Sequence, residues 1–201
     1  MLTPYQSRST KQTNELDGKF LSVVVPIYNE EQNIRPLLAR LHPVMEQIGV
    51  PFEVILVDDG SKDRSAETAA VAAREYGQVK LICFSRNFGK EAALNAGLAH
   101  AKGDAVIQLD ADLQHPPEII FDFIREWQEG NEIVFGARRS RESETFMRRI
   151  LAKSFYRVSS AISDVKLMEG LGDFLLLDRK VVDAILSLPE RERFTLSLIH
   201  I

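Results

Sequence analysis

The chain has 201 residues, of which 45% are hydrophobic and 27% charged, a composition typical of one globular domain rather than of a disordered chain. Its formal net charge of −4 at pH 7 gives no reason to expect nucleic acid as a partner. The sequence contains no run of about 18 apolar residues, the length that a membrane-spanning helix requires. The polar residues 1–19 lack the apolar core of a signal peptide, so we expect them to form a flexible tail.

From residue 20 onward, short apolar runs alternate with helical patterns. We predict strands over the nearly continuous apolar runs 20–27, 52–57, 80–84, 105–109 and 133–135. Helices are predicted where apolar residues recur at spacings of three and four, over 33–48, 64–76, 90–101 and 118–129. This alternation indicates parallel βαβ units, and therefore an α/β fold with a Rossmann-like, doubly wound and mostly parallel sheet flanked by helices.

The C-terminal part of the chain is less regular. Residues 138–149 carry five arginines and precede the amphipathic segment 150–162, which is either a solvated surface helix or a helix that lies on a membrane or binds a phosphate. A further strand is expected over 170–177 and a short helix over 180–188. Residues 195–201 stop abruptly, so we expect the natural protein to continue and these last residues to be non-native.

The single cysteine, Cys83, lies within an apolar run. We interpret it as a buried core thiol, and one cysteine cannot form an internal disulfide, which fits a reducing compartment.

Polar residues follow each predicted strand. Those after the first are Tyr28, Asn29 and Glu30, and Asp58 and Asp59 end the second. Residues 85–90 follow the third strand and Arg138 follows the fifth. One such ending could be a helix cap, as with Ser61 or Asp63 before residue 64, but capping does not explain acids at three strand ends. Because open α/β sheets bind ligands beyond the carboxyl ends of their strands, we expect a ligand at this edge.

Asp110 and Asp112 follow the fourth strand and are separated by one residue. If the strand pleat continued, both side chains would point to the same side. Two like charges at the end of a buried strand are costly unless a positive group lies between them. Their hard oxygens suit Mg²⁺ or Mn²⁺, which take further ligands from phosphates, so the pair predicts a cation that carries a diphosphate.

Several other site types are excluded by missing motifs. The first strand is not followed by G-x-G-x-x-G, and neither a P-loop nor a G-x-S-x-G motif is present. The four histidines are scattered, and we interpret His115, before two prolines, as a loop residue. A phosphatase with Asp110 as nucleophile is disfavoured because Gln114 stands where that class has Thr or Val.

Three motifs in order resemble family 2 glycosyltransferases of the GT-A fold. They are Val23-Val-Val-Pro-Ile-Tyr-Asn-Glu30, Val57-Asp-Asp-Gly-Ser61 and Asp110-Ala-Asp-Leu-Gln114. The stretch 85–97, together with 110–118, is similar to the polyprenyl-phosphate branch, which includes dolichol-phosphate mannose synthase and undecaprenyl-phosphate glucosyltransferases. The resemblance covers residues 20–194, which it implies are a GT-A catalytic domain whose C-terminal membrane part is absent here.

The resemblance also implies roles for individual residues. Those around the nucleotide sugar would be Pro26, Tyr28, Asn29, Glu30, Leu56, Asp58, Asp59, Lys90, Asp110, Ala111, Asp112 and Arg138. Asp110, Asp112 and Gln114 would hold Mg²⁺ or Mn²⁺, while Arg138, Arg148, Arg149 and Ser154 would meet the acceptor phosphate. Asp110, Asp112 and Asp173 would be the catalytic acids, with Asp173, in Gly172-Asp173-Phe174, facing the acceptor.

The implied reaction is inverting transfer from a UDP- or GDP-sugar to a polyprenyl phosphate, at the cytoplasmic face of the plasma membrane. The acceptor is already anionic, so positioning and charge neutralisation would carry most of the catalysis. The full-length protein would contact the membrane surface and could form a homo-oligomer. Two alternatives stay open: a soluble family 2 enzyme with a saccharide acceptor, and a truncated module that binds nucleotide sugar without turnover.

Overall fold

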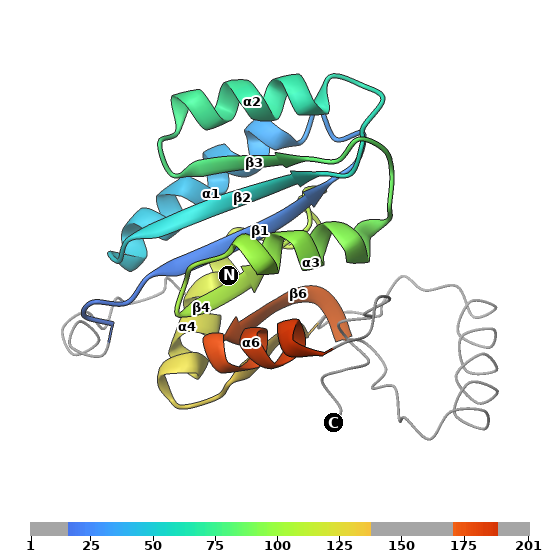
Figure 1. The fold of residues 1–201 in the computed structure, drawn as a ribbon. Coiled ribbons are helices and arrows are strands. Elements are labelled where there is room, and N and C mark those ends of the chain that lie inside the picture. Colours follow the sequence, from blue (N-terminus) through green and yellow to red (C-terminus); the bar gives the residue numbers. More distant parts are fainter. Residues whose placement is uncertain (1–15, 138–170, 189–201) are drawn as a thin grey trace, which may run out of the picture.

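The computed structural model describes residues 16–137 and 171–188 (Figure 1). The elements are β1 (Leu21–Ile27), α1 (Ile34–Ile48), β2 (Phe52–Asp58), α2 (Ser65–Glu75), β3 (Val79–Cys83), α3 (Lys90–His100), β4 (Ala105–Gln108), the 3₁₀ helix η1 (Pro117–Ile119), α4 (Ile120–Gln128), β5 (Ile133–Ala137), β6 (Leu171–Asp178) and α6 (Arg179–Ser187). Each strand and helix predicted within these residues is present, with boundaries that differ from the predicted ones by at most two residues.

Six strands form one sheet in the order β3-β2-β1-β4-β6-β5. β1 pairs in parallel with β2 and β4, and β2 pairs in parallel with β3. β6 runs antiparallel to both of its neighbours, β4 and β5. The predicted doubly wound, mostly parallel sheet is therefore confirmed, with β6 inserted between β4 and β5.

Helices cover both faces of this sheet (Figure 1). α1, α2 and α4 contribute to the hydrophobic cluster on one face, and α3 and α6 to the cluster on the other. β1 supplies both clusters, with Val23 and Val25 on the first face and Val24 on the second. This two-sided burial explains why β1 is a continuous apolar run instead of an alternating one. No helix within residues 16–137 and 171–188 is long and apolar enough to span a bilayer.

Two sequence expectations are altered by this packing. Cys83 is exposed, so the prediction of a buried core thiol was wrong. It ends β3, which lies at the edge of the sheet and has only one neighbouring strand. Leu16 is buried in the core and Lys19 lies 5.7 Å from the Trp127 ring centroid, so residues 16–19 belong to the folded domain and not to the tail.

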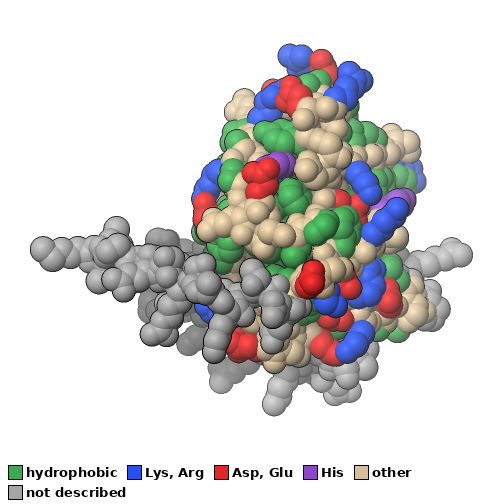
Figure 2. All heavy atoms as spheres, turned by 90° about the vertical axis from the view of Figure 1, so that its left-hand side faces the viewer, with side chains coloured by type: hydrophobic (Ala, Val, Ile, Leu, Met, Phe, Trp, Pro, Cys, Tyr) green, Lys and Arg blue, Asp and Glu red, His purple; other side chains and the backbone are tan. Residues whose placement is uncertain are grey.

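A buried carboxylate lies at the opposite edge of the sheet, at the amino ends of β1 and β2, and binds together several segments there. Glu53 is only 2% exposed and accepts hydrogen bonds from the Ser22 hydroxyl at 2.7 Å, the Lys102 N–H at 2.8 Å and Lys80 Nζ at 2.5 Å. Burial raises the pKa of Glu53, but the bonds from Lys80, Lys102 and Ser22 outweigh it and the pKa is lowered. Figure 2, which views this side of the molecule, shows Lys and Arg interspersed with Asp and Glu.

We predict that Glu53→Gln lowers the free energy of unfolding by about 2 kcal/mol at pH 7, because donors that meet a carboxylate would meet an amide NH₂. Since the folded-state pKa of Glu53 is depressed, its stabilisation is complete above the unfolded-state pKa and is lost as pH falls through the folded-state value. Urea denaturation of both proteins from pH 7 to pH 3 measures this. Glu75→Gln, at an exposed ion pair with Arg35, is the control. An equal effect of both substitutions at pH 7 would contradict the prediction.

Candidate functional site

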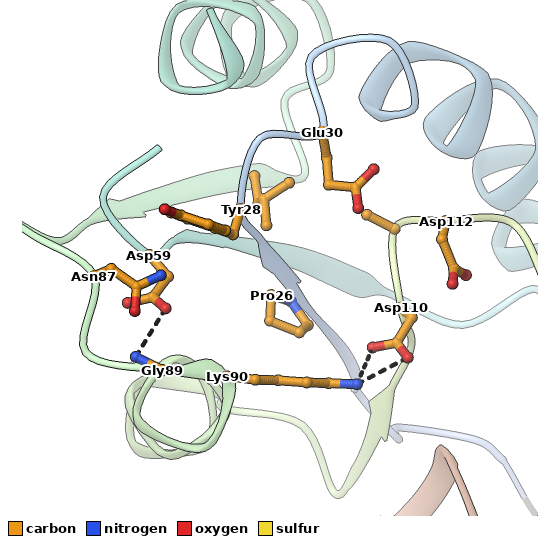
Figure 3. A pocket seen from close by; sticks show the side chains of 11 residues that line it. Pro26, Tyr28, Glu30, Asp59, Asn87, Gly89, Lys90, Asp110 and Asp112 are labelled. Atoms are coloured by element: carbon orange, nitrogen blue, oxygen red, sulfur yellow. Dashed lines mark hydrogen bonds and ion pairs between the residues drawn. The ribbon is translucent and has the colours of Figure 1, made fainter. Parts of the chain in front are cut away.

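A pocket of about 310 Å³ opens at the carboxyl edge of the sheet (Figure 3). We call it the sheet-edge pocket, and it is lined by Pro26, Ile27, Tyr28, Glu30, Asp59, Asn87, Gly89, Lys90, Asp110, Ala111 and Asp112. These residues end or follow β1, β2, β3 and β4, and the chain reverses its direction of winding between β1 and β4. The pocket therefore lies at the topological switch point, where open α/β sheets bind their ligands, and its volume suits a small molecule.

The loop after β1 is fixed by residues 61–65, which comprise the end of the loop after β2 and the first residue of α2. Asn29 has a φ of 56°, a left-handed conformation that Asn tolerates better than most residues. Its N–H donates to Ser61 Oγ at 2.9 Å, and its Oδ1 accepts the Lys62 N–H at 2.8 Å. The Glu30 N–H donates to Ser65 Oγ at 2.7 Å. Asn29 thus clamps two loops together and presents its neighbours Tyr28 and Glu30 to the pocket.

The loop before α3 is held by Asp59. This carboxylate is 3% exposed and accepts the Phe88 N–H at 2.7 Å on one oxygen and the Gly89 N–H at 2.9 Å on the other. Gly60, with a φ of 65°, lets the same loop approach closely, because a Cβ there would lie 2.4 Å from the Arg86 carbonyl carbon. Asp59 lines the pocket and at the same time fixes the backbone from which Lys90 extends.

β4 ends at Gln108, and Asp112 lies in the turn that follows Asp110. The strand pleat does not continue through both residues, so the condition under which their side chains would point to the same side is not met. Asp112 accepts the Gln114 N–H at 3.0 Å, and Leu113 has a φ of 59°, which is rare for a non-glycine residue. Such strained backbone is concentrated at functional sites, which supports a role for this turn.

Lys90 extends along the pocket to Asp110 (Figure 3). Its Nζ lies 2.7 Å from one carboxylate oxygen of Asp110 and 2.9 Å from the other. Four carboxylates and one ammonium group line the pocket, which gives it a formal charge of −3. An arrangement of this kind attracts cations and repels an unaccompanied anion.

Eight of the residues expected around a nucleotide sugar lie together in the pocket. They are Pro26, Tyr28, Glu30, Asp59, Lys90, Asp110, Ala111 and Asp112. Three others do not line it: Asn29 is the loop clamp, while Leu56 and Asp58 are buried at the end of β2. Asp58 accepts the Ser61 N–H at 3.2 Å through Oδ2, and its Oδ1 has no hydrogen-bond partner among the described residues.

The remaining expected residues lie elsewhere in the chain. Gln114 is exposed and follows Asp112 in the same turn. The backbone of Asp173 lies in β6, but its side chain is outside the described part of the structure. Arg138, Arg148, Arg149 and Ser154 also lie outside the described residues.

Three pocket residues were not singled out from the sequence, namely Ile27, Asn87 and Gly89. Asn87 and Gly89 belong to the polar stretch after the third strand, so the position of that stretch was the available signal.

Two smaller expectations can also be compared with the structure. Asp63 accepts the Ser65 N–H at 2.9 Å at the start of α2, as a cap would, and the His115 ring packs 5.5 Å from the Phe174 ring.

Cys83, although exposed, is poorly suited to act as a nucleophile. Desolvation and the negative charge of Asp58 both raise the pKa of its thiol, which disfavours the reactive thiolate.

The donor set of the pocket fits a magnesium or manganese ion. Within the described residues no group of three or more His, Cys, Asp or Glu side chains is arranged as a metal site. Asp110 and Asp112 nevertheless supply the hard oxygens that Mg²⁺ and Mn²⁺ prefer, and these ions commonly use one or two carboxylates together with substrate phosphates. The pair therefore fits an ion that binds together with a phosphate ligand.

An α/β sheet with a pocket at its switch point is the arrangement in which doubly wound folds bind their ligands. The chain matches the family model described as glycosyl transferase family 2 over residues 22–186, and it belongs to this family. The resemblance seen in the sequence is thereby confirmed.

Relatives with curated descriptions include an uncharacterized glycosyltransferase, sll0501, of Synechocystis sp., which is 48% identical over 174 residues, 87% of this chain and 55% of the relative. A bactoprenol glucosyl transferase of Shigella phage SfV is 41% identical over 174 residues, 87% of this chain and 57% of the relative. The latter supports the polyprenyl-phosphate branch. The chain spans about half the length of these relatives.

Solved structures share the fold. Mannosyl-3-phosphoglycerate synthase from Rubrobacter xylanophilus superimposes with a TM-score of 0.63 at 19% identity, covering 83% of this chain and 56% of that one. Glucosyl-3-phosphoglycerate synthase from Mycobacterium tuberculosis, solved with Mn²⁺, UDP and phosphoglyceric acid, gives 0.59 at 24% identity, covering 83% and 58%. At these identities the likeness concerns the fold, which is GT-A.

We predict that Asp59→Asn loosens the loop before α3, because an amide NH₂ would replace one of the two oxygens that accept the Phe88 and Gly89 N–H groups. The expected loss of stability is about 1–3 kcal/mol. Hydrogen exchange should become faster at residues 85–90. Asp183→Asn, on the exposed face of α6, is the control and should leave exchange there unchanged. Unchanged protection in Asp59→Asn would show that Asp59 does not hold the loop.

Proposed function

We propose that this chain transfers a sugar, with inversion, from a UDP- or GDP-sugar to a polyprenyl phosphate and that it uses Mg²⁺ or Mn²⁺. The observation that carries the proposal is the sheet-edge pocket, with a formal charge of −3, at the switch point of a GT-A fold. The similarity to the bactoprenol glucosyl transferase of Shigella phage SfV supports the polyprenyl-phosphate acceptor.

The charges that line the pocket favour a nucleotide-sugar donor that binds together with a cation. Two like unit charges about 4 Å apart repel by about 4 kcal/mol at an effective dielectric constant of about 20. An uncompensated diphosphate would meet several such repulsions in a pocket lined by Glu30, Asp59, Asp110 and Asp112. A divalent cation held by Asp110 and Asp112, with Gln114, would replace these repulsions by attraction. When bound, it would neutralise the charge that develops on the departing diphosphate.

The protein side chains then position the donor. Tyr28 is 40% exposed at the wall of the pocket, where its ring is available to the nucleoside. Asn29 and Asp59 act mainly by fixing the loops that form the wall. Lys90 donates hydrogen bonds along the pocket and, with Arg138, would bind the phosphate groups.

The acceptor side of the proposal rests on residues outside the described part of the structure. Arg148, Arg149 and Ser154, together with Arg138, would bind the lipid phosphate, and Asp173 would orient the acceptor. An acceptor phosphate oxygen would attack the anomeric carbon as the bond to the nucleotide diphosphate breaks, which gives inversion in a single displacement. We place this reaction at the cytoplasmic face of the plasma membrane, and the full-length protein could act there as a homo-oligomer.

A second candidate function is binding of the nucleotide sugar without transfer. Incubation of the chain with radiolabelled UDP- or GDP-sugar and undecaprenyl phosphate discriminates the two: label that moves into the organic phase shows transfer. Label that stays with the nucleotide, in a protein that binds it, shows binding alone.

We predict that calorimetric titration detects binding of UDP or GDP in the presence of Mn²⁺ and much weaker binding in its absence. Asp110→Asn should weaken the Mn²⁺-dependent binding roughly 100-fold, about 2.7 kcal/mol, because it removes an anionic oxygen ligand. Asp122→Asn, an exposed position on α4, is the matched control and should bind as the unmodified chain does. Equal binding by Asp110→Asn and Asp122→Asn, in folded samples, would remove Asp110 from the site.

A further inference from the structure

The contact between Lys90 and Asp110 uses both oxygens of the carboxylate. Lys90 Nζ lies 2.7 Å from one oxygen and 2.9 Å from the other. These are the oxygens that would bind a divalent cation. Because the ammonium group lies across both of them, a cation at Asp110 would meet a positive charge directly against its ligand.

The position of Lys90 in its helix makes this contact notable. Lys90 is the first residue of α3, and Gly89 precedes it with a φ of 97°. The amino end of a helix carries a partial positive charge, so a lysine there is electrostatically unfavourable. Pairing with Asp110 offsets that repulsion. The same helix end, with its lysine, would favour an anion in the pocket.

Lys90 also has the freedom to change partners. Its side chain is 39% exposed and that of Asp110 is 25% exposed, so neither is locked into the core. Its backbone, by contrast, is fixed by the two hydrogen bonds that Asp59 accepts from Phe88 and Gly89. A partly exposed lysine side chain on a fixed backbone can turn its ammonium group from one anionic group of the pocket to another.

We infer that Lys90 takes the cation position at Asp110 when no divalent cation is bound and moves to the donor diphosphate when one binds. This inference rests on the proposed function. The exchange makes binding of metal and nucleotide mutually dependent: metal alone must displace Lys90 from Asp110, whereas metal with nucleotide gives Lys90 a new anionic partner. Lys90 therefore acts as a positioning residue that suppresses metal binding in the absence of donor.

The test measures two affinities in Lys90→Met and in the unmodified chain. Electron paramagnetic resonance gives the affinity for Mn²⁺ alone, and calorimetry gives the affinity for UDP, or GDP if that is the nucleotide bound, at saturating Mn²⁺. We predict that Lys90→Met binds Mn²⁺ alone about 5-fold or more tightly and binds the nucleotide about 10-fold more weakly, changes within the usual size of coupling between sites. If the substitution merely damaged the pocket, the affinities for Mn²⁺ alone and for the nucleotide would both fall.

Two variants serve as controls. Lys102→Met removes a positive charge at the opposite edge of the sheet and should leave both affinities unchanged. It therefore controls for the change in net charge that Lys90→Met also makes. Lys90→Arg keeps a cation at the position and should retain weak binding of Mn²⁺ alone, so the inference can be tested even if Lys90→Met does not fold.

The same measurements distinguish failure of the Lys90 exchange from failure of the proposed function. If the unmodified chain binds nucleotide in a Mn²⁺-dependent way but Lys90→Met binds Mn²⁺ alone no more tightly than Lys102→Met does, the exchange is refuted and the proposed function stands. Tight binding of Mn²⁺ alone by the unmodified chain and by Lys90→Arg would refute the exchange as well. If the folded, unmodified chain binds neither UDP nor GDP with Mn²⁺, the proposed function fails and the exchange fails with it.

Discussion

Repulsion between carboxylates at one edge of the sheet is the constraint on which the rest of the site depends. Glu30, Asp59, Asp110 and Asp112 line one pocket because the carboxyl ends of parallel strands meet there. Hydrogen bonds to Asp59 and Asp112 from backbone N–H groups, and the ion pair of Lys90 with Asp110, reduce the repulsion. The remaining negative charge of the pocket would be offset by a divalent cation.

The scaffold fixes this charge arrangement mainly through side-chain-to-backbone hydrogen bonds. Asn29 joins the loops after β1 and β2, and Asp59 joins the end of β2 to the start of α3. Glu53 ties the other edge of the sheet together with an acid that is fully bonded to protein donors. The acids thus differ between the two edges: Glu53 is buried and purely structural, whereas those at the carboxyl edge line a pocket.

The sequence predicted the parallel core well because β1, β2 and β4 are buried on both faces, which leaves uninterrupted apolar runs. The convergence of strand ends pointed to Tyr28, Glu30, Asp59, Lys90, Asp110 and Asp112, whereas Pro26 and Ala111 were implied by the resemblance to family 2 glycosyltransferases. The sequence could not predict that β6 lies antiparallel between β4 and β5, because pairing between distant segments leaves no local pattern. Cys83 was placed wrongly for a related reason: the apolar character of β3 does not reveal that it is an edge strand. The bond from Lys90 to Asp110 likewise depends on how the loops after β3 and β4 meet.

A crystal structure of the chain with Mn²⁺ and UDP, or with GDP if that is the nucleotide it binds, would test the central claim most directly. The account predicts an anomalous manganese peak at Asp110 and Asp112, next to the diphosphate in the sheet-edge pocket, with Lys90 Nζ on a phosphate oxygen. A nucleotide bound outside this pocket, or one bound within it without manganese while Lys90 remains on Asp110, would contradict it.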